Sequence, residues 1–338
     1  MNQTTDWNEV GRIAGTVTLC MLAGRYLHLG SPVYLALFPI LSVTKARDYR
    51  WSGLIKMFLP VVVSATLALL TVELFSDHPF IVWSLSLLGF DQLRRRATTP
   101  AKLGGMILPT FNWILIVVFA QQPSFVMADR IREIALSLVI TIVVMKAMNG
   151  LFPRTSQCVA AGPPPQPVGH RDRFWYLLLL GGGLAFLMIV DMISATFCMV
   201  PVIIAAAQTR KPGYLAVIRA RFIAQVGGCA LAMVFQLLLL GHQHLLPLYS
   251  LSIFVLVLTL AWLIGRSQGA EKELHGDALL GIALPIQLYM GTADIGLQST
   301  FLRGWQLSVT LFLLLALSGL IYGRTHHDTE HHLNHRTG

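Results

Sequence analysis

The chain has 338 residues, of which 55% are hydrophobic and only 12% are charged, and its mean hydropathy is +0.65. Soluble domains carry about twice that share of charged residues, so the composition excludes a soluble globular protein and predicts an integral membrane protein. In a membrane protein, basic residues are placed mainly by membrane topology. The formal net charge of +9 therefore does not by itself indicate a polyanionic partner.

The N-terminal stretch MNQTTDWNEVGRIAG lacks the charged region, short apolar region and small-residue cleavage site of a signal peptide, so we expect the first apolar segment to be retained. A bilayer core of about 30 Å needs roughly 20 helical residues to cross. Apolar stretches between charged clusters therefore predict an all-α, polytopic membrane protein. We expect its segments near 10–30, 31–44, 52–75, 78–90, 103–121, 130–150, 174–190, 192–208, 217–240, 245–264, 278–292 and 302–322.

Two of these segments are short, 31–44 and 192–208, and the sequence does not decide whether they cross the bilayer. The stretch 174–208 is too long for one straight span and tight for two, with Asp191 near its middle. It predicts a kinked hairpin or a re-entrant pair.

Short motifs recur in the same order in both halves of the chain. GMILP at 105–109 returns as GIALP at 281–285, and REIALS at 132–137 returns as RGWQLS at 303–308. The proline-bearing YLALFPIL (34–41) likewise pairs with TFCMVPVI (196–203). We predict two parallel repeats of about six segments, in the same membrane orientation, at 1–152 and 174–323. A proline-rich cytoplasmic linker (153–173) joins them, and a His-rich cytoplasmic tail (324–338) follows.

The basic residues predict the orientation. With both termini in the cytoplasm, 21 of the 25 Lys and Arg residues fall on the inner side, and the exceptions are Arg25, Arg130, Arg132 and Arg303. This asymmetry is the one expected for an inner-membrane protein. It accounts for most of the net charge, so we expect no nucleic-acid partner.

The sequence has no phosphate-binding loop of the G-x-x-x-x-G-K-[ST] type, no H-E-x-x-H and no G-x-S-x-G. We therefore expect no enzymatic activity and no cofactor, and any transport would be driven by an ion gradient or by the gradient of the substrate. The four cysteines are far apart and fit apolar packing better than a metal or redox site. His327, His331 and His335 are spaced for one helix face, but a solvated tail without metal is the favoured interpretation.

Charges inside apolar segments are costly, by about 3 kcal/mol at a helix centre, and so are candidates for function. Asp191 and Glu73 are the candidate proton-coupling carboxylates; the alternatives are a hydrated outer turn for Asp191 and an interfacial position for Glu73. The duplication places Lys56 and Arg221 at corresponding positions, where they would attract an organic anion. Anchoring by the positive-inside rule is the alternative for both.

The repeated prolines indicate a substrate path. Pro109 and Pro285 each remove one helical hydrogen bond, and an amide side chain follows within a turn, Asn112 or Gln287. Broken helices with nearby amides often border a substrate path. The alternative interpretation is that both prolines kink their helices for packing only.

These segments resemble the fusaric acid resistance proteins, a family within the aromatic acid exporter superfamily of bacterial inner-membrane proteins. The resemblance rests on the duplicated unit, on YLALFPILSV followed by a basic loop, and on the basic residue that opens GLIKMFLPVVVSATLAL and VIRARFIAQVGGCALAM. Two features depart from the family pattern. No glycine follows Lys56, whereas Gly227 and Gly228 follow Arg221, and the large cytoplasmic domain of longer members is absent.

The resemblance implies export of aromatic or other amphipathic organic acids, driven by the proton gradient, commonly with a periplasmic adaptor of the membrane-fusion class. The plant malate channels look like distant relatives with one six-span unit per chain, so this chain is similar to a fused dimer of them. We therefore expect an inner-membrane efflux transporter that binds small organic anions. A passive organic-anion channel and a non-transporting component of an envelope assembly are the alternatives. An antiporter needs a proton-carrying carboxylate, and neither alternative does.

Overall fold

The computed structural model describes residues 6–27, 29, 32–46, 48–122, 126–154, 167–190, 193–291 and 294–322. The linker residues 155–166, Cys158 among them, and the tail from residue 323 lie outside these ranges, as does Asp191. The regular elements within them are helical, with no strand among the described residues. The α-helices are α1 (Trp7–Tyr26), α2 (Tyr34–Val43), α3 (Trp51–Phe75), α4 (Pro79–Arg96), α5 (Pro100–Phe119), α6 (Met127–Leu151), α7 (His170–Val190), α8 (Met199–Ala206), α9 (Lys211–Arg221), α10 (Gly227–Leu238), α11 (Leu246–Arg266), α12 (Ala270–Tyr289) and α13 (Leu297–Tyr322).

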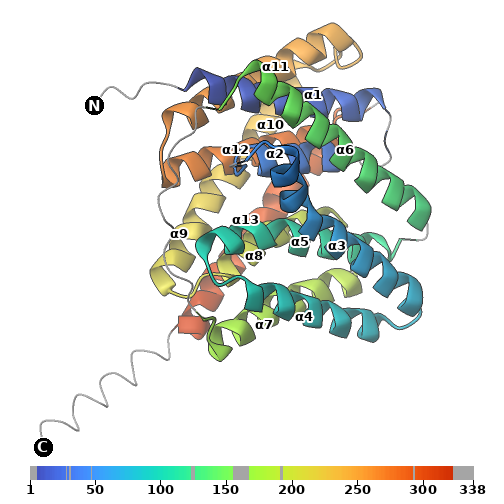
Figure 1. The fold of residues 1–338 in the computed structure, drawn as a ribbon, viewed down its shortest axis with the longest axis vertical. Coiled ribbons are helices and arrows are strands. Elements are labelled where there is room, and N and C mark those ends of the chain that lie inside the picture. Colours follow the sequence, from blue (N-terminus) through green and yellow to red (C-terminus); the bar gives the residue numbers. More distant parts are fainter. Residues whose placement is uncertain are drawn as a thin grey trace, which may run out of the picture. The chain divides into compact units, whose positions relative to one another are not determined.

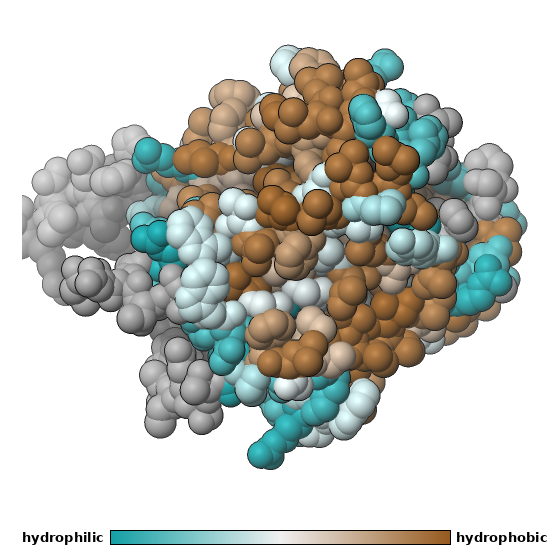
Figure 2. Space-filling model, turned by 90° about the horizontal axis from the view of Figure 1, so that it is seen from above, coloured by the Kyte–Doolittle hydropathy of each residue, from teal (hydrophilic) through white to brown (hydrophobic). Residues whose placement is uncertain are grey.

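Each predicted membrane segment corresponds to a helix. Seven stretches of the described chain are long and apolar enough to cross a membrane: Trp51–Phe75, Pro100–Phe119, Asp129–Leu151, His170–Val190, Lys211–Leu238, Leu246–Arg266 and Leu297–Tyr322. Large apolar side chains such as Leu59, Val63 and Leu70 of α3 are about half exposed, as expected for a surface in contact with lipid. The face drawn in Figure 2 carries many such hydrophobic side chains. The protein is therefore an all-α, polytopic membrane protein, as the composition predicted.

The two short predicted segments form short helices. The ten residues of α2 extend about 15 Å, too little to cross a bilayer. In the second half of the chain, α7 ends at Val190, and the chain resumes as a 3₁₀-helix, η1 (Ile193–Cys198), that leads into the eight-residue α8. The stretch 174–208 therefore contains two helical parts, α7 and the η1–α8 pair, and residues 191 and 192 between them lie outside the described residues.

A π-helical turn, η2 (Phe222–Val226), joins α9 to α10 and lies beside a tight helix crossing. A Cβ atom on Gly281 of α12 would lie 2.9 Å from the carbonyl oxygen of Ala224 and from the Cα of Gln225. A Cβ atom on Gly228 of α10 would lie 2.9 Å from the carbonyl carbon of Gly281. Only glycine lets the two backbones approach this closely. The repeated Gly-x-x-Leu-Pro motif is asymmetric here, because a Cβ atom on Gly105 would meet nothing within 4 Å.

The chain forms two compact units, each assembled from both halves of the sequence. Unit 1 comprises Met1–Thr66, Gln122–Ala161 and Ile223–Trp305, and unit 2 comprises Leu67–Gln121, Gly162–Phe222 and Gln306–Gly338. In unit 1, α1 packs along α11, α2 and α6, and α12 packs on α10, α11 and α2. In unit 2, α7 packs along α4 and α8, and α5 packs on the same two helices. Figure 1 shows α4 and α7 side by side.

The packing inside one unit corresponds to the packing inside the other. The first helix of each predicted repeat, α1 or α7, packs on the fourth helix of the other repeat, α11 or α4. The short second helix, α2 or α8, packs on the fifth helix of the other repeat. The units therefore divide the chain differently from the predicted repeats at 1–152 and 174–323. Those repeats are inferred from sequence motifs, and they stay a prediction.

Candidate functional site

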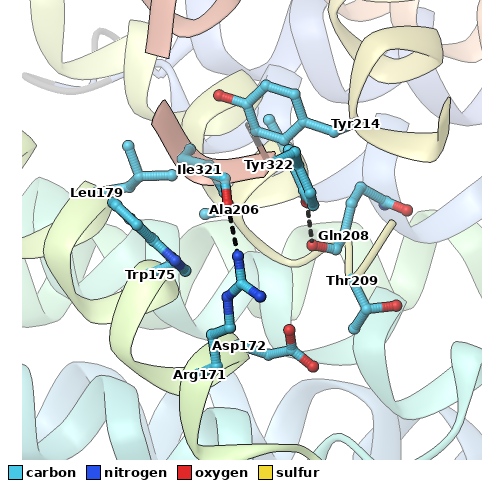
Figure 3. A pocket seen from close by; sticks show the side chains of 11 residues that line it. Arg171, Asp172, Trp175, Leu179, Ala206, Gln208, Thr209, Tyr214, Ile321 and Tyr322 are labelled. Atoms are coloured by element: carbon cyan, nitrogen blue, oxygen red, sulfur yellow. Dashed lines mark hydrogen bonds between the residues drawn. The ribbon is translucent and has the colours of Figure 1, made fainter. Parts of the chain in front are cut away.

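A small cavity of about 100 Å³ opens within unit 2. Its lining residues, from four helices and the connection after α8, are Arg171, Asp172, Trp175, Leu179, Ala205, Ala206, Gln208, Thr209, Tyr214, Ile321 and Tyr322. Figure 3 shows these side chains arranged around the end of α13.

Hydrogen bonds to backbone carbonyls fix the walls of the cavity. Arg171 donates from Nη2 to the carbonyl oxygen of Ile321 over 3.1 Å, and Tyr322 donates from its hydroxyl to the carbonyl oxygen of Gln208 over 3.0 Å, as Figure 3 shows. Tyr214 donates to the carbonyl oxygen of Leu314 over 3.0 Å. The rings of Tyr214 and Tyr322 meet edge to face, with centroids 5.6 Å apart. These contacts preorganise an aromatic wall beside a guanidinium group.

The charges of the cavity suit a small, amphipathic organic ligand. Arg171 is exposed, and its guanidinium has five N–H donors, one of which is directed at Ile321. Asp172 supplies acceptor oxygens, and the ring of Trp175 supplies an apolar face. A carboxylate would be recognised by Arg171, and a ring by the aromatic side chains.

A buried amide lies on α5, as the repeated prolines suggested. Pro109 is buried inside α5, and Asn112, one turn later, is fully buried. Both polar side-chain atoms of Asn112 lack a hydrogen-bond partner among the described residues. Burying an amide without a partner costs about 1–3 kcal/mol, so water or a substrate is expected to satisfy it.

The corresponding amide of α12 has a structural partner. Gln287 follows Pro285 in a buried stretch and donates from Nε2 to the carbonyl oxygen of Met21 over 3.3 Å. A Cβ atom on Gly24 would lie 2.5 Å from this same Nε2 atom, so Gly24 makes room for the amide against α1. Gln287 therefore binds α12 to α1, while its Oε1 atom has no partner among the described residues.

The predicted charged residues have contrasting environments. Lys56 is exposed on α3, in unit 1, whereas Arg221 is buried at the end of α9, in unit 2, directly before the π-helical turn. Glu73 is exposed on α3, and Asp191 lies outside the described residues. The predicted roles of these four residues stay predictions.

Sequence reasoning missed a buried carboxylate in a membrane-spanning helix. Glu133 of α6 is 7% exposed and accepts a hydrogen bond from Nη1 of Arg130 over 3.1 Å. The sequence predictions placed the neighbouring Arg130 and Arg132 on the outer side and gave Glu133 no role. The spacing could have indicated its burial, because Glu133, Ser137 and Thr141 recur every fourth residue and define one helix face. All three are buried.

Two partly buried ion pairs connect helices from different halves of the sequence. In unit 2, Arg173 of α7 binds both carboxylate oxygens of Asp91 of α4, over 2.8 and 2.7 Å. In unit 1, Lys272 of α12 lies 2.6 Å from each carboxylate oxygen of Glu9 of α1. Each pair thus holds a helix of one predicted repeat against a helix of the other, an arrangement we call the exchange of helices.

A family model described as a protein of unknown function (DUF2955) matches residues 10–148 of the chain. The family is one of membrane proteins, in agreement with the fold. The matched stretch ends within α6, so it covers the first predicted repeat only. No curated protein and no solved structure matches the chain. The resemblance to the fusaric acid resistance proteins stays a prediction.

Proposed function

We propose that the chain is an inner-membrane efflux transporter for small aromatic or other amphipathic organic acids, driven by the proton gradient. The observation that carries this proposal is the cavity of unit 2, where Arg171 lies beside Trp175, Tyr214 and Tyr322. A guanidinium next to aromatic rings recognises a carboxylate attached to a ring. The polytopic helical fold is compatible with transport.

The predicted topology supports the direction of export. The cavity is formed by the beginning of α7 and the end of α13, which the distribution of basic residues assigns to the cytoplasmic side. A substrate would thus bind from the cytoplasm. Water-exposed Arg171 would attract the anion before its ring enters the cavity. A periplasmic adaptor, which the resemblance implies, would act on the opposite side.

Transport into liposomes tests the proposal. The purified chain is reconstituted, a pH gradient is imposed, and the movement of a radiolabelled benzoate is measured. We expect wild-type protein to move benzoate in response to the gradient. Absence of movement for a panel of aromatic and aliphatic carboxylates would overturn the proposal, and movement that ignores the pH gradient would favour a passive channel.

A pair of arginine variants tests the cavity itself. Arg171→Gln removes a charge-assisted hydrogen bond to a carboxylate, worth about 1.5–3 kcal/mol when fully formed, and partial exposure reduces this to roughly tenfold in affinity. Arg219→Gln is the matched control, since Arg219 is an exposed arginine of the same unit that does not line the cavity. Equal benzoate affinity in the two variants would remove the cavity from the proposed site.

A further inference from the structure

Unit 1 contains a buried carboxylate beside a row of hydroxyl groups, along the seam where α6 meets α1 and α2. Glu133 is the seventh residue of α6, about 9 Å from the beginning of the helix. Ser137 and Thr141 follow on the same face and are fully buried. The row from Glu133 to Thr141 covers about 12 Å, toward the middle of the span.

Several groups in this seam lack protein partners. The hydroxyl of Ser137 has no hydrogen-bond partner among the described residues, and neither does that of Thr16, one turn before Cys20 on α1. Cys20 forms a side-chain hydrogen bond with Thr141. The Thr141 hydroxyl donates to the carbonyl oxygen of Ser137 over 2.7 Å. Buried polar groups are satisfied by water where the protein does not satisfy them, so a hydrated seam is expected here.

The seam is closed toward the other end of the unit. Met145 and Met148 continue the buried face of α6 beyond Thr141. A Cβ atom on Gly15 of α1 would lie 2.3 Å from the sulfur of Met148, so α1 and α6 are in close apolar contact there. We therefore expect water to reach the hydroxyl row from the beginning of α6, where the Arg130 side chain is 16% exposed, rather than from this end.

We infer that this seam is a proton inlet and that Glu133 is its proton-binding group, reached by water from the end at which α6 begins. This inference rests on the proposed function, for which it supplies the proton-coupling carboxylate. The proton adds to a carboxylate oxygen of Glu133, which becomes a neutral carboxylic acid, and Arg130 keeps its charge and loses its anionic partner. The basic-residue asymmetry assigns this end to the outer side, where the proton concentration is higher.

The charged and titratable groups around Glu133 come from each packed helix. On α6 itself the neighbour is Arg130, and on α2 it is Tyr34, whose hydroxyl lies within electrostatic reach of both Arg130 and Glu133. On α1, Cys20 faces Thr141. The remaining charged groups of α1 are engaged elsewhere: Arg12 with Phe152, Arg25 with Met290 and Gln243, and Glu9 with Lys272.

The first experiment measures water access without any transport assay. Full-length protein with Cys20 as its one remaining cysteine, the other three replaced by serine, is placed in nanodiscs and treated with a charged methanethiosulfonate. We expect Cys20 to react about tenfold faster than Cys198 in the corresponding protein that keeps Cys198, because only a hydrated thiol ionises and reacts. Ser137→Val should slow the reaction of Cys20. Reaction of Cys20 as slow as that of Cys198 would overturn the inlet.

The second experiment measures coupling. Glu133→Gln removes the titratable group at nearly constant volume, and it should reduce pH-driven benzoate transport by about tenfold or more while exchange of benzoate without a pH gradient continues. Glu133→Asp should restore the pH dependence. Asp129→Asn is the matched control, since Asp129 and Arg132 form an exposed pair with the same spacing on the same helix.

The outcomes separate the two proposals. If wild-type protein moves no organic acid, the proposed function fails and the cysteine experiment still decides the inlet. If wild-type protein responds to a pH gradient and Glu133→Gln responds equally, the inlet is not the coupling site and the inference is wrong.

Discussion

The crossing of α10 and α12 provides a matched pair of glycine substitutions within one repeated motif. Gly281 and Gly105 occupy the same place in Gly-x-x-Leu-Pro, but only Gly281 lies against another backbone. In Gly281→Ala the new methyl group would lie 2.9 Å from the carbonyl oxygen of Ala224 and from the Cα of Gln225, so the helices must separate. Overpacking of this kind costs about 1–3 kcal/mol.

The control substitution should have the opposite effect. In Gly105→Ala the methyl group meets nothing within 4 Å, and replacing a helical glycine by alanine stabilises a helix by up to about 1 kcal/mol. The same gain offsets part of the cost at position 281, which leaves a net destabilisation of about 0–2 kcal/mol. The difference between the two variants should therefore be about 1–3 kcal/mol.

Denaturant unfolding of the purified variants in mixed micelles measures this difference, with tryptophan fluorescence as the signal. We expect Gly281→Ala to unfold at a lower denaturant concentration than wild type, and Gly105→Ala at an equal or higher one. Indistinguishable unfolding midpoints for the two variants would refute the close backbone contact at Gly281. They would also refute the role of this glycine in letting α10 and α12 approach.

Three further predictions test other contacts. Arg173→Gln leaves the mostly buried carboxylate of Asp91 with Arg95 as its remaining ion-pair partner, so unfolding should become easier by about 1–3 kcal/mol. Asp91→Asn together with Arg173→Gln should recover part of this loss in a double-mutant cycle. Trp83→Phe removes the 2.9 Å hydrogen bond from Nε1 to the carbonyl oxygen of Gly181, and a stability loss of about 1 kcal/mol is expected in the same unfolding assay; no change would mean that water replaces the indole. Burial raises the pKa of Tyr49, which lies in the connection before α3, so the folded state favours the neutral phenol. The free energy of unfolding should therefore fall as pH rises above the ordinary tyrosine pKa of about 10. Tyr49→Phe should lessen that fall in a thermal unfolding series from pH 9 to 11, and an unchanged slope would contradict the raised pKa of Tyr49.

Local signals in the sequence were sufficient for the helices. The composition and the length of the apolar stretches predicted an all-α membrane protein, and the predicted segments correspond to helices. The break within 174–208 was predicted because no helix of that length fits a bilayer of about 30 Å. The short segments at 31–44 and 192–208 form α2 and the pair η1 and α8, because ten to fourteen residues with an internal proline can fold only into short helices.

Long-range packing was not readable from local signals. Nothing in the spacing of α1 indicates that its main neighbour is α11, because pairing depends on the shape of distant surfaces. For the same reason the charge asymmetry left Arg25, Arg130 and Arg303 as exceptions, whereas the structure encloses them partly or fully within unit 1. The cavity around Arg171 combines residues separated by more than one hundred positions, and no motif marks them. Glu133 was within reach of the sequence, since its fourfold spacing with Ser137 and Thr141 is local.

The exchange of helices between the two halves has a consequence for how the protein is made. Roughly 220 residues separate the end of α1 from the start of α11, its main packing partner. At about 5–20 residues per second, a ribosome needs roughly 10 to 45 s to synthesise them. Throughout that interval Arg25 has neither Gln243 nor Met290 to bind, since both belong to later segments. A guanidinium at the membrane without its final partners is costly, so the nascent N-terminal helices are expected to remain beside the insertion machinery, or with a membrane chaperone, until the second half of the chain is synthesised.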